Sequence, residues 1–273
     1  MKVAGFPSSV VLYGTGLMGC SLALALRRQN PKIKIYGVDD RDVLERAREL
    51  QAIEITAAPP KAADLLILAT PVGAILKQLE DLPSDTTGLI LDIGSTKAAI
   101  CETAQRRHLP FIGGHPMTGS ERSGPEAASA DLFKDAPFFL CPISSTPKDA
   151  VSRLTPVLEG IGAQPVVLNA EKHDRLVAQL SHLPQILSTL IADQASGDTT
   201  LAGPGWKSMT RLAGSPFHVW RDILQTSRFL PQELKSFETR LRAVVKALES
   251  GNVDELEAVF EKANRLVAGQ DHE

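Results

Sequence analysis

A glycine-rich turn constrains the fold of this 273-residue chain more than any other feature of the sequence. The turn, Gly14 to Gly19, lies between the apolar run Val10 to Tyr13 and a stretch with helical spacing. Gly14 permits a tight turn, Gly16 lets a pyrophosphate approach the backbone, and Gly19 lets the helix lie close to the strand. The order of strand, glycine turn and helix predicts the first βαβ unit of a parallel sheet.

A second predicted strand, Lys32 to Val38, ends in Asp39, twenty residues beyond Gly19. A carboxylate at this place can hold the ribose hydroxyls of an adenosine, so the turn and the acid together predict dinucleotide binding. Asp39 favours NAD because a carboxylate repels the 2′-phosphate of NADP, and Arg41 keeps NADP as the less favoured alternative. The predicted cofactor-binding residues are Gly14, Thr15, Gly16, Leu17, Met18, Gly19 and Asp39, with Thr70, Pro71 and Ser95 from later loops.

Strand-like and helix-like segments continue to alternate, which predicts an α/β domain with a Rossmann-type, doubly wound and mainly parallel sheet. The strand-like segments are Asp64 to Ala69, Gly88 to Asp92, Pro137 to Cys141 and Pro165 to Leu168, and the helix-like segments are Val72 to Glu80, Thr96 to Arg107 and Lys148 to Glu159. Loops at the carboxyl ends of such strands face the cofactor. We expect this of three loops, Ala69 to Val72, Asp92 to Lys97 and Gly113 to Gly124.

The character of the sequence changes after Asn169, where strand-like runs stop and apolar residues recur at helical spacing. We therefore predict two domains: a dinucleotide-binding domain of residues 1–169 and an all-α domain of residues 170–273 that binds substrate. The apolar stripes of the second domain are long enough to favour a homodimer through its helices. A helical bundle within one chain is the alternative.

Composition and charge exclude several classes of partner. The net charge is −3 and no basic run stands out, so we expect no nucleic acid partner. No stretch has 18 consecutive apolar residues, so we expect no membrane partner. The three cysteines, Cys20, Cys101 and Cys141, are scattered and match no metal or disulfide pattern, which predicts reduced thiols in a cytoplasmic protein without a metal site.

The stretch Gly113 to Gly124 has the composition of a site loop, with four glycines, a proline and several hydroxyl groups. Within it, His115 is a natural proton acceptor because the ordinary pKa of histidine lies near neutral pH. Taken alone, His115 is equally well explained as a cap of a strand end. Its predicted place beside the nicotinamide favours a catalytic role. Ser95 has two interpretations that can hold together, a site residue and the N-cap of the next helix.

The helical part of the sequence holds further candidates. Arg211 can clamp a carboxylate through two hydrogen bonds, and a solvated surface charge is the alternative. His182 precedes Pro184, which must break or kink its helix, so His182 is either a cleft residue or a buried core histidine. His173 and Asp174 have the simpler interpretation of a charge cluster near a helix N-terminus. Trp220 is predicted to be core.

Together these segments resemble the prephenate and arogenate dehydrogenases, the NAD(P)-dependent enzymes of tyrosine biosynthesis. The resembling motifs are Gly14 to Gly19, Ala69 to Pro71, Asp92 to Lys97, Gly113 to Gly124, His173-Asp174, Ser181 to Pro184, and Thr210 to Ala213 followed by Trp220. The resemblance implies that His115 is the catalytic hydrogen-bond acceptor and that Ser95 is the second catalytic residue. It also implies a substrate site, for which we predict His182, Arg211, Lys207 and Thr118.

The resemblance implies oxidative decarboxylation of prephenate to 4-hydroxyphenylpyruvate, of arogenate to tyrosine, or of both. Three departures from the family pattern leave the choice of substrate open. The chain has Gly205 to Ser208 where Gly-Phe-Arg-Asp is common, Gly214 to Pro216 where Ser-Asp-Pro is usual, and Gln185 where many members have a histidine. The alternatives are a related two-domain β-hydroxyacid dehydrogenase, which would favour a helix-borne lysine, and a dinucleotide sensor without turnover.

Overall fold

The computed structural model describes residues 6–55, 60, 63–120 and 122–269 of the chain. Glu121, part of the predicted site loop, lies outside the described residues. The chain divides into two compact units, Met1–Arg228 and Phe229–Glu273. The described strands are β1 (Ser9–Tyr13), β2 (Lys34–Val38), β3 (Leu65–Leu68), β4 (Leu89–Asp92), β5 (Phe111–Pro116), β6 (Pro137–Pro142) and β7 (Gln164–Val167). The α-helices are α1 (Leu17–Gln29), α2 (Arg41–Glu49), α3 (Val72–Asp81), α4 (Ala98–Arg106), α5 (Ala150–Gly160), α6 (Ala170–Val177), α7 (Leu183–Gln194), α8 (Pro204–Thr210), α9 (Phe217–Thr226), α10 (Leu230–Ser250) and α11 (Val253–Ala268).

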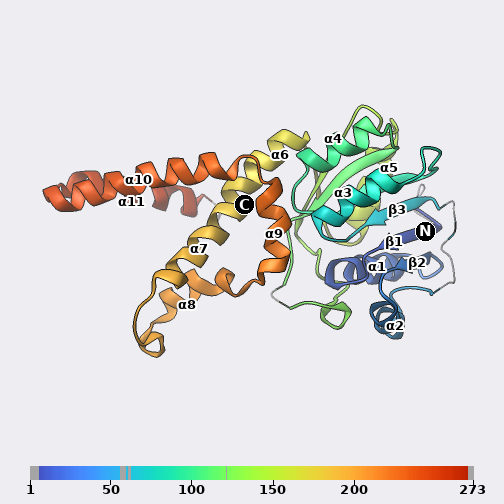
Figure 1. The fold of residues 1–273 in the computed structure, drawn as a ribbon, viewed down its shortest axis with the longest axis horizontal. Coiled ribbons are helices and arrows are strands. Elements are labelled where there is room, and N and C mark those ends of the chain that lie inside the picture. The colour runs from blue at the N-terminus through green and yellow to red at the C-terminus, as the bar shows by residue number, and fades with distance from the viewer. Residues whose placement is uncertain (1–5, 56–59, 61–62, 121, 270–273) are drawn as a thin grey trace. The chain divides into compact units, whose positions relative to one another are not determined.

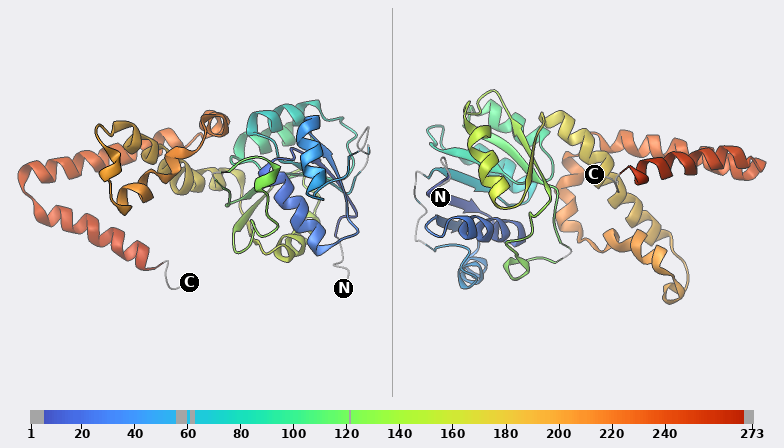
Figure 2. Two further views of the ribbon diagram at one scale, coloured as in Figure 1. Left: turned by 90° about the horizontal axis from the view of Figure 1, so that it is seen from below. Right: turned by 180° about the vertical axis from the view of Figure 1, so that it is seen from behind.

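The described strands form one sheet in the order β2-β1-β3-β4-β5-β6-β7, with helices on both faces (Figures 1 and 2). Neighbouring strands are parallel except for β5 and β6, which run antiparallel. The predicted fold class, a mainly parallel doubly wound sheet followed by helices, is therefore confirmed. The strand order reverses between β1 and β3, and ligands of such sheets bind at the carboxyl ends of the strands beside this reversal.

Both faces of the central part of the sheet are buried because the inner strands, such as β3 and β4, are nearly continuous apolar runs, whereas the edge strand β7 is mostly exposed. One face packs against buried side chains of α1 and α5, such as Leu26 and Leu154. The other packs against buried side chains of α3 and α4, such as Ile75 and Ile100. This double burial fixes the carboxyl ends of the strands, where the polar residues of the predicted site lie.

The structure corrects the prediction that residues from Gly113 onward form a loop. Strand β5 continues to Pro116 and all six of its residues are buried. Close packing rather than a turn explains the two glycines, strictly at Gly114 and less strictly at Gly113. A Cβ on Gly114 would lie 2.4 Å from the carbonyl oxygen of Asp92, and one on Gly113 would lie 3.0 Å from Cys101 Sγ. His115 is therefore held at the end of a core strand, with the loop starting only after it.

The helical segment α6 to α9 belongs to the same compact unit as the sheet. Between α6 and α7 the helix widens into a π-helical turn, Ala178–His182, and Pro184 lies in the first turn of α7. Proline lacks the N–H that would bond to the carbonyl four residues before it, and here the helix widens directly before the proline. Single π-helical turns recur at functional sites, and this one ends at His182.

The second unit consists of α10 and α11. Helix α10 ends at Gly251, which adopts the left-handed conformation with φ of 65°, and the side chain of Asn252 caps α11 by accepting a hydrogen bond from the Glu255 N–H. These are common residues for a helix end and a helix start. No helix in the described part of the chain is long and apolar enough to span a membrane.

Candidate active site

The glycine turn after β1 has the shape that the sequence predicts. Gly14 has φ of +88°, and a Cβ on Gly19 would lie only 2.0 Å from the Gly14 carbonyl oxygen, so both positions need glycine. A Cβ on Gly16 would instead have no atom within 4 Å. Helix α1 begins directly after Gly16, with no side-chain cap and no acid in its first turn. The open backbone and the positive helix terminus fit the pyrophosphate of a dinucleotide.

Asp39 lies at the carboxyl end of β2 and is tied to this turn. Its Oδ2 accepts hydrogen bonds from the Thr15 N–H at 2.7 Å and from the Thr15 hydroxyl at 3.2 Å. The side chain is exposed, as is that of Arg41 at the start of α2. Across the turn, Pro71 is the N-cap residue of α3. The predicted cofactor residues of these three loops therefore lie at the carboxyl ends of β1, β2 and β3.

A cavity of about 410 Å³ lies between the end of β5 and the helical segment, within the first unit. Its walls include most of the residues predicted for catalysis and substrate binding: Ser95, His115, Thr118, His182 and Arg211. Trp220, predicted as core, also lines it and is half-buried. Lys207 is exposed on α8 and is not among the lining residues of this cavity. The structure thus brings together side chains more than 100 positions apart.

His115 is 8% exposed, and its Nδ1 lies 2.8 Å from Nε2 of His173. Burial is the main cause that holds the pKa of His115 well below its ordinary value, and positive charge on His173, Lys97 or His182 lowers it further. The imidazole is therefore neutral near pH 7. A neutral imidazole on a cavity wall can accept a proton from a bound molecule.

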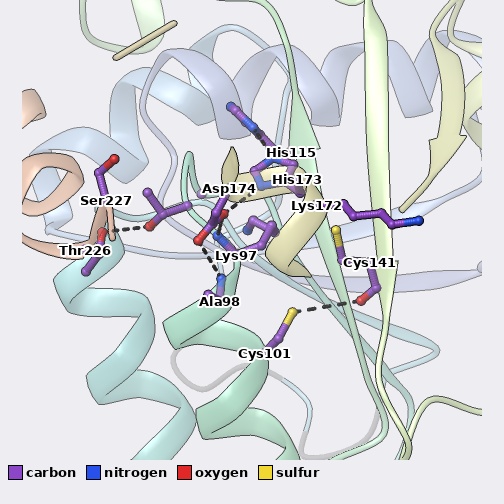
Figure 3. A network of polar contacts seen from close by, with 12 residues as sticks. Lys97, Ala98, Cys101, His115, Cys141, Lys172, His173, Asp174, Thr226 and Ser227 are labelled. Carbon is purple, nitrogen blue, oxygen red and sulfur yellow. Dashed lines mark hydrogen bonds and ion pairs between the residues drawn. The ribbon is translucent and has the colours of Figure 1, made fainter. Parts of the chain in front are cut away.

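His173 and Asp174 were predicted to be a charge cluster near a helix N-terminus, and their burial was not predicted. Both lie within α6 and are buried, and His173 Nδ1 lies 2.8 Å from Asp174 Oδ1. Asp174 in turn accepts hydrogen bonds from the backbone N–H groups of Lys97 at 2.7 Å and Ala98 at 2.9 Å (Figure 3). One sequence signal was present: His173 precedes the buried Val177 by four residues, so both lie on the same helix face.

The predicted N-cap role of Ser95 is not seen. Helix α4 begins at Ala98 with Lys97 as N-cap residue, and its first N–H groups are satisfied by Asp174 instead. Ser95 is half-buried on the cavity wall. It is therefore placed to contact a bound molecule rather than to start the helix.

Asp92 and Lys97 form a fully buried ion pair beneath the site. Asp92 also accepts hydrogen bonds from the N–H groups of Gly94 at 2.8 Å and Gly114 at 3.1 Å. These contacts fix the end of β5 directly before His115. The acid and the lysine of the Asp92 to Lys97 motif thus position the site, and Ser95 between them faces the cavity.

His182 is buried on the other wall of the cavity. Its Nδ1 lies 2.7 Å from the Ser227 hydroxyl, and its ring packs edge-on against Trp220 with 5.9 Å between the ring centroids. Among the described residues its Nε2 has no hydrogen-bond partner. Burial lowers the pKa of His182 to about 4, so this imidazole is also neutral at pH 7. A buried polar nitrogen of this kind on a cavity wall is suited to a polar ligand group.

Comparison with protein families gives matches over most of the chain. Residues 22–167 match the family model described as prephenate dehydrogenase, nucleotide-binding domain, and residues 169–262 match the one described as prephenate dehydrogenase, dimerization domain. The prephenate dehydrogenase of Bacillus subtilis (strain 168) is 33% identical over 270 residues, covering 92% of this chain and 72% of that protein. The cyclohexadienyl dehydrogenase of Zymomonas mobilis subsp. mobilis is 29% identical over 287 residues, covering 97% of each.

Solved structures agree with these matches. The prephenate dehydrogenase of A. aeolicus in complex with hydroxyphenyl propionate and NAD+ has a TM-score of 0.83 at 28% identity, with 95% of this chain and 98% of that chain covered. The arogenate dehydrogenase of Synechocystis has a TM-score of 0.78 at 27% identity, with 94% and 97% covered. The fold, the glycine turn and these matches together show that the chain belongs to the prephenate dehydrogenase family of oxidoreductases.

Proposed function

We propose that this protein catalyses the NAD-dependent oxidative decarboxylation of prephenate, of arogenate, or of both, in tyrosine biosynthesis. The observation that carries the proposal is the buried, neutral His115 at the end of β5, on the wall of the cavity that Ser95, His182 and Arg211 also line. The relatives are named for the same chemistry on prephenate, arogenate or cyclohexadienyl substrates.

The substrate is a cyclohexadienol with a carboxylate on the ring carbon opposite its hydroxyl group. A dinucleotide held by the turn of Gly14 to Gly19 and by Asp39 would supply an acceptor for the hydride on the carbon that bears the hydroxyl. His115 accepts the hydrogen bond of this hydroxyl and holds its proton as the C–O bond gains carbonyl character. Loss of CO₂ returns the electrons of the C–C bond to the ring, and the phenolic oxygen takes the proton back. General-base assistance of this kind contributes about 10²- to 10⁴-fold in rate.

The other cavity residues bind and orient the substrate in this proposal. Ser95 orients the hydroxyl toward His115. Arg211 binds a substrate carboxylate, and His182 donates or accepts a hydrogen bond through Nε2 beside it. The Thr118 hydroxyl donates to the Leu132 carbonyl at 2.9 Å, which leaves its oxygen able to accept from the substrate. Holding the reacting atoms in place can supply a larger part of the rate enhancement than proton transfer.

NAD is the cofactor that we propose over NADP. The exposed Asp39 carboxylate, held against the turn by Thr15, is placed where a ribose would meet it and would repel a 2′-phosphate. Arg41 is the nearby residue that opposes this preference. Titration with both cofactors tests it, with tighter binding of NAD expected and tighter binding of NADP as the contrary result.

We further propose a cytoplasmic homodimer formed through the helical part of the chain. The second family match is to a dimerization domain, and α10 and α11 carry large exposed apolar side chains, such as Phe260 at 69% and Leu266 at 70% exposure. The three cysteines are free thiols. We keep the predicted division into residues 1–169 and 170–273 as part of the proposal, because the two family matches meet near this point.

One assay tests the activity directly. The purified protein is mixed with NAD⁺ and either prephenate or arogenate, and NADH is followed by its absorbance. We expect NADH from at least one of the two. Absence of NADH with both substrates, for protein that still binds NAD, would reject the proposed function.

A further inference from the structure

Behind His115 a chain of polar contacts leads to the amino-terminal end of α4 (Figure 3). It passes from His115 Nδ1 to His173 Nε2, from His173 Nδ1 to Asp174 Oδ1, and from the two Asp174 oxygens to the N–H groups of Lys97 and Ala98. Each of these contacts is between 2.7 and 2.9 Å long. These contacts join β5 to α6 and α6 to α4.

We propose that His173 and Asp174 are positioning residues that hold His115 in the tautomer whose bare Nε2 accepts the proton of the substrate hydroxyl. This inference rests on the proposed function and assigns a role to two residues outside the predicted site. The tautomer of His115 follows when donor and acceptor are assigned for each contact in turn, from Asp174 to His173 and from His173 to His115.

Asp174 is the end of this row of contacts whose protonation state is fixed first. Burial disfavours its charge, but hydrogen bonds from His173 and from the Ala98 and Lys97 N–H groups outweigh burial, and the pKa of Asp174 is lowered. It is therefore a carboxylate, which can only accept hydrogen bonds. The N–H groups also belong to the positive end of α4, which favours a negative charge there. His173 must consequently carry its proton on Nδ1.

His173 transmits this constraint to His115. Its side chain is fully buried, and burial lowers its pKa, so it is neutral and carries a single ring proton. With that proton on Nδ1, its Nε2 is a lone pair and can only accept. The 2.8 Å contact is then a hydrogen bond that His115 Nδ1–H donates. Because His115 is neutral too, its own Nε2 carries the free lone pair.

The arrangement also stabilises the state in which His115 has accepted a proton. The Nδ1–H of an imidazolium makes a stronger, charge-assisted hydrogen bond to His173, and the negative charge of Asp174 lies one ring further on. Of the other groups around His115, Lys97 and His182 disfavour its positive charge, and Lys97 is itself paired with Asp92. A buried carboxylate behind a histidine has the same two effects, on tautomer and on charge, in Ser-His-Asp triads.

Two matched substitutions separate positioning from packing. In His173→Asn the amide occupies the place of Nδ1, so it can still contact Asp174 but cannot reach His115. In His173→Gln the amide oxygen can reach the place of Nε2 and accept the His115 Nδ1–H. We expect kcat to fall about 100-fold in the Asn variant with KM changed less than threefold. We expect kcat of the Gln variant to be at least tenfold higher than kcat of the Asn variant. Lys172→Gln, an exposed neighbour on α6, serves as the control with unchanged kcat.

The same comparison includes the pH dependence of kcat. Loss of the hydrogen bond to His173 makes the imidazolium of His115 less stable. In the plot of kcat against pH, the acidic limb should therefore move to lower pH in the Asn variant. In the Gln variant it should stay near its wild-type position. Equal losses in the two variants, or an unchanged acidic limb in both, would mean that His173 acts only through packing and would overturn the proposal.

Nitrogen-15 NMR of the histidine-labelled full-length protein tests the tautomer without turnover or substitution of His173. The chain has six histidines, and comparison with His115→Asn assigns the signals of His115. We expect a protonated Nδ1 and a bare Nε2 at neutral pH. A protonated Nε2 would overturn the proposal. Because this readout needs no substrate, failure of the proposed activity and failure of the positioning role give different results.

Discussion

Gly16 and Gly19 of the nucleotide turn look alike in the sequence, but the structure predicts different effects of replacing each of them by alanine. At Gly19 the new Cβ would lie 2.0 Å from the Gly14 carbonyl oxygen, whereas ordinary contact begins at 3.4 Å. The start of α1 would have to move by about 1.4 Å, and this helix contributes Leu22, Ala23 and Leu26 to the core. Overpacking of this kind costs about 1–3 kcal/mol. For a domain of this size the midpoint of thermal unfolding should fall by roughly 2–12 °C.

Gly16→Ala is the matched comparison. Its Cβ would have no atom within 4 Å, and the backbone at Gly16, with φ of −75° and ψ of −160°, is extended and open to alanine. We expect the free energy of unfolding to stay within about 0.5 kcal/mol of wild type. The methyl group would instead occupy space that the pyrophosphate needs. Affinity for NAD should fall at least tenfold, which corresponds to about 1.4 kcal/mol.

Thermal unfolding of the free protein and calorimetric titration with NAD measure the two effects separately. The reasoning predicts a stable variant that binds poorly at Gly16 and an unstable variant at Gly19. Wild-type affinity in Gly16→Ala would show that the dinucleotide does not approach this part of the backbone. A loss of stability in Gly16→Ala as large as that in Gly19→Ala would show that the turn is packed differently.

Three further predictions concern the buried polar groups and the cavity. Lys97→Met should lower the free energy of unfolding by about 3–5 kcal/mol in urea titrations, because it leaves the buried Asp92 unpaired; a change below 1 kcal/mol would contradict this. His115, His173 and His182 are neutral in the folded protein with lowered pKa values and take up protons on unfolding, so stability should be full above about pH 6.5 and be lost as the pH falls toward 4. Urea titrations at pH 7.5 and 5.5 measure this, and equal stability at both would refute it. Steady-state kinetics should show that His115→Asn lowers kcat with NAD binding retained, whereas Arg211→Ala mainly raises KM; the reverse pattern would exchange the two roles.

The cofactor half of the molecule could be predicted from sequence because its signals are local. A strand, a glycine turn and a helix follow one another within about 20 residues, and the acid after the next strand stands at a fixed distance. The mainly parallel sheet follows from the repetition of this unit along the chain. The sequence also marked His115, Ser95, His182 and Arg211 as candidates, each with a simpler alternative, and the family resemblance favoured a site role for each of them. The structure places all four around one cavity.

Two features could not be predicted because their causes are not local. The glycines at 113 and 114 suggested a turn, since a sequence does not distinguish a glycine needed for a positive φ from one needed for close packing against Asp92. The contact of His115 with His173 joins residues 58 positions apart. It depends on how α6 packs on β5, and each histidine taken singly has an adequate simpler explanation.

The buried charges give a physical reason for the arrangement around His115. Among the described residues the buried charged side chains are Asp92, Lys97 and Asp174. Asp92 and Lys97 neutralise each other, which leaves the Asp174 carboxylate as an excess buried negative charge. Such a charge is costly in a core unless hydrogen bonds hold it, and here two N–H groups at the positive end of α4 do so. The cost is offset most when a positive charge appears nearby, and in the proposed reaction this happens when His115 takes up the substrate proton. The Asp174 carboxylate is therefore stabilised more in the transition state, where His115 gains positive charge, than in the ground state. Catalysis by differential binding requires such a difference.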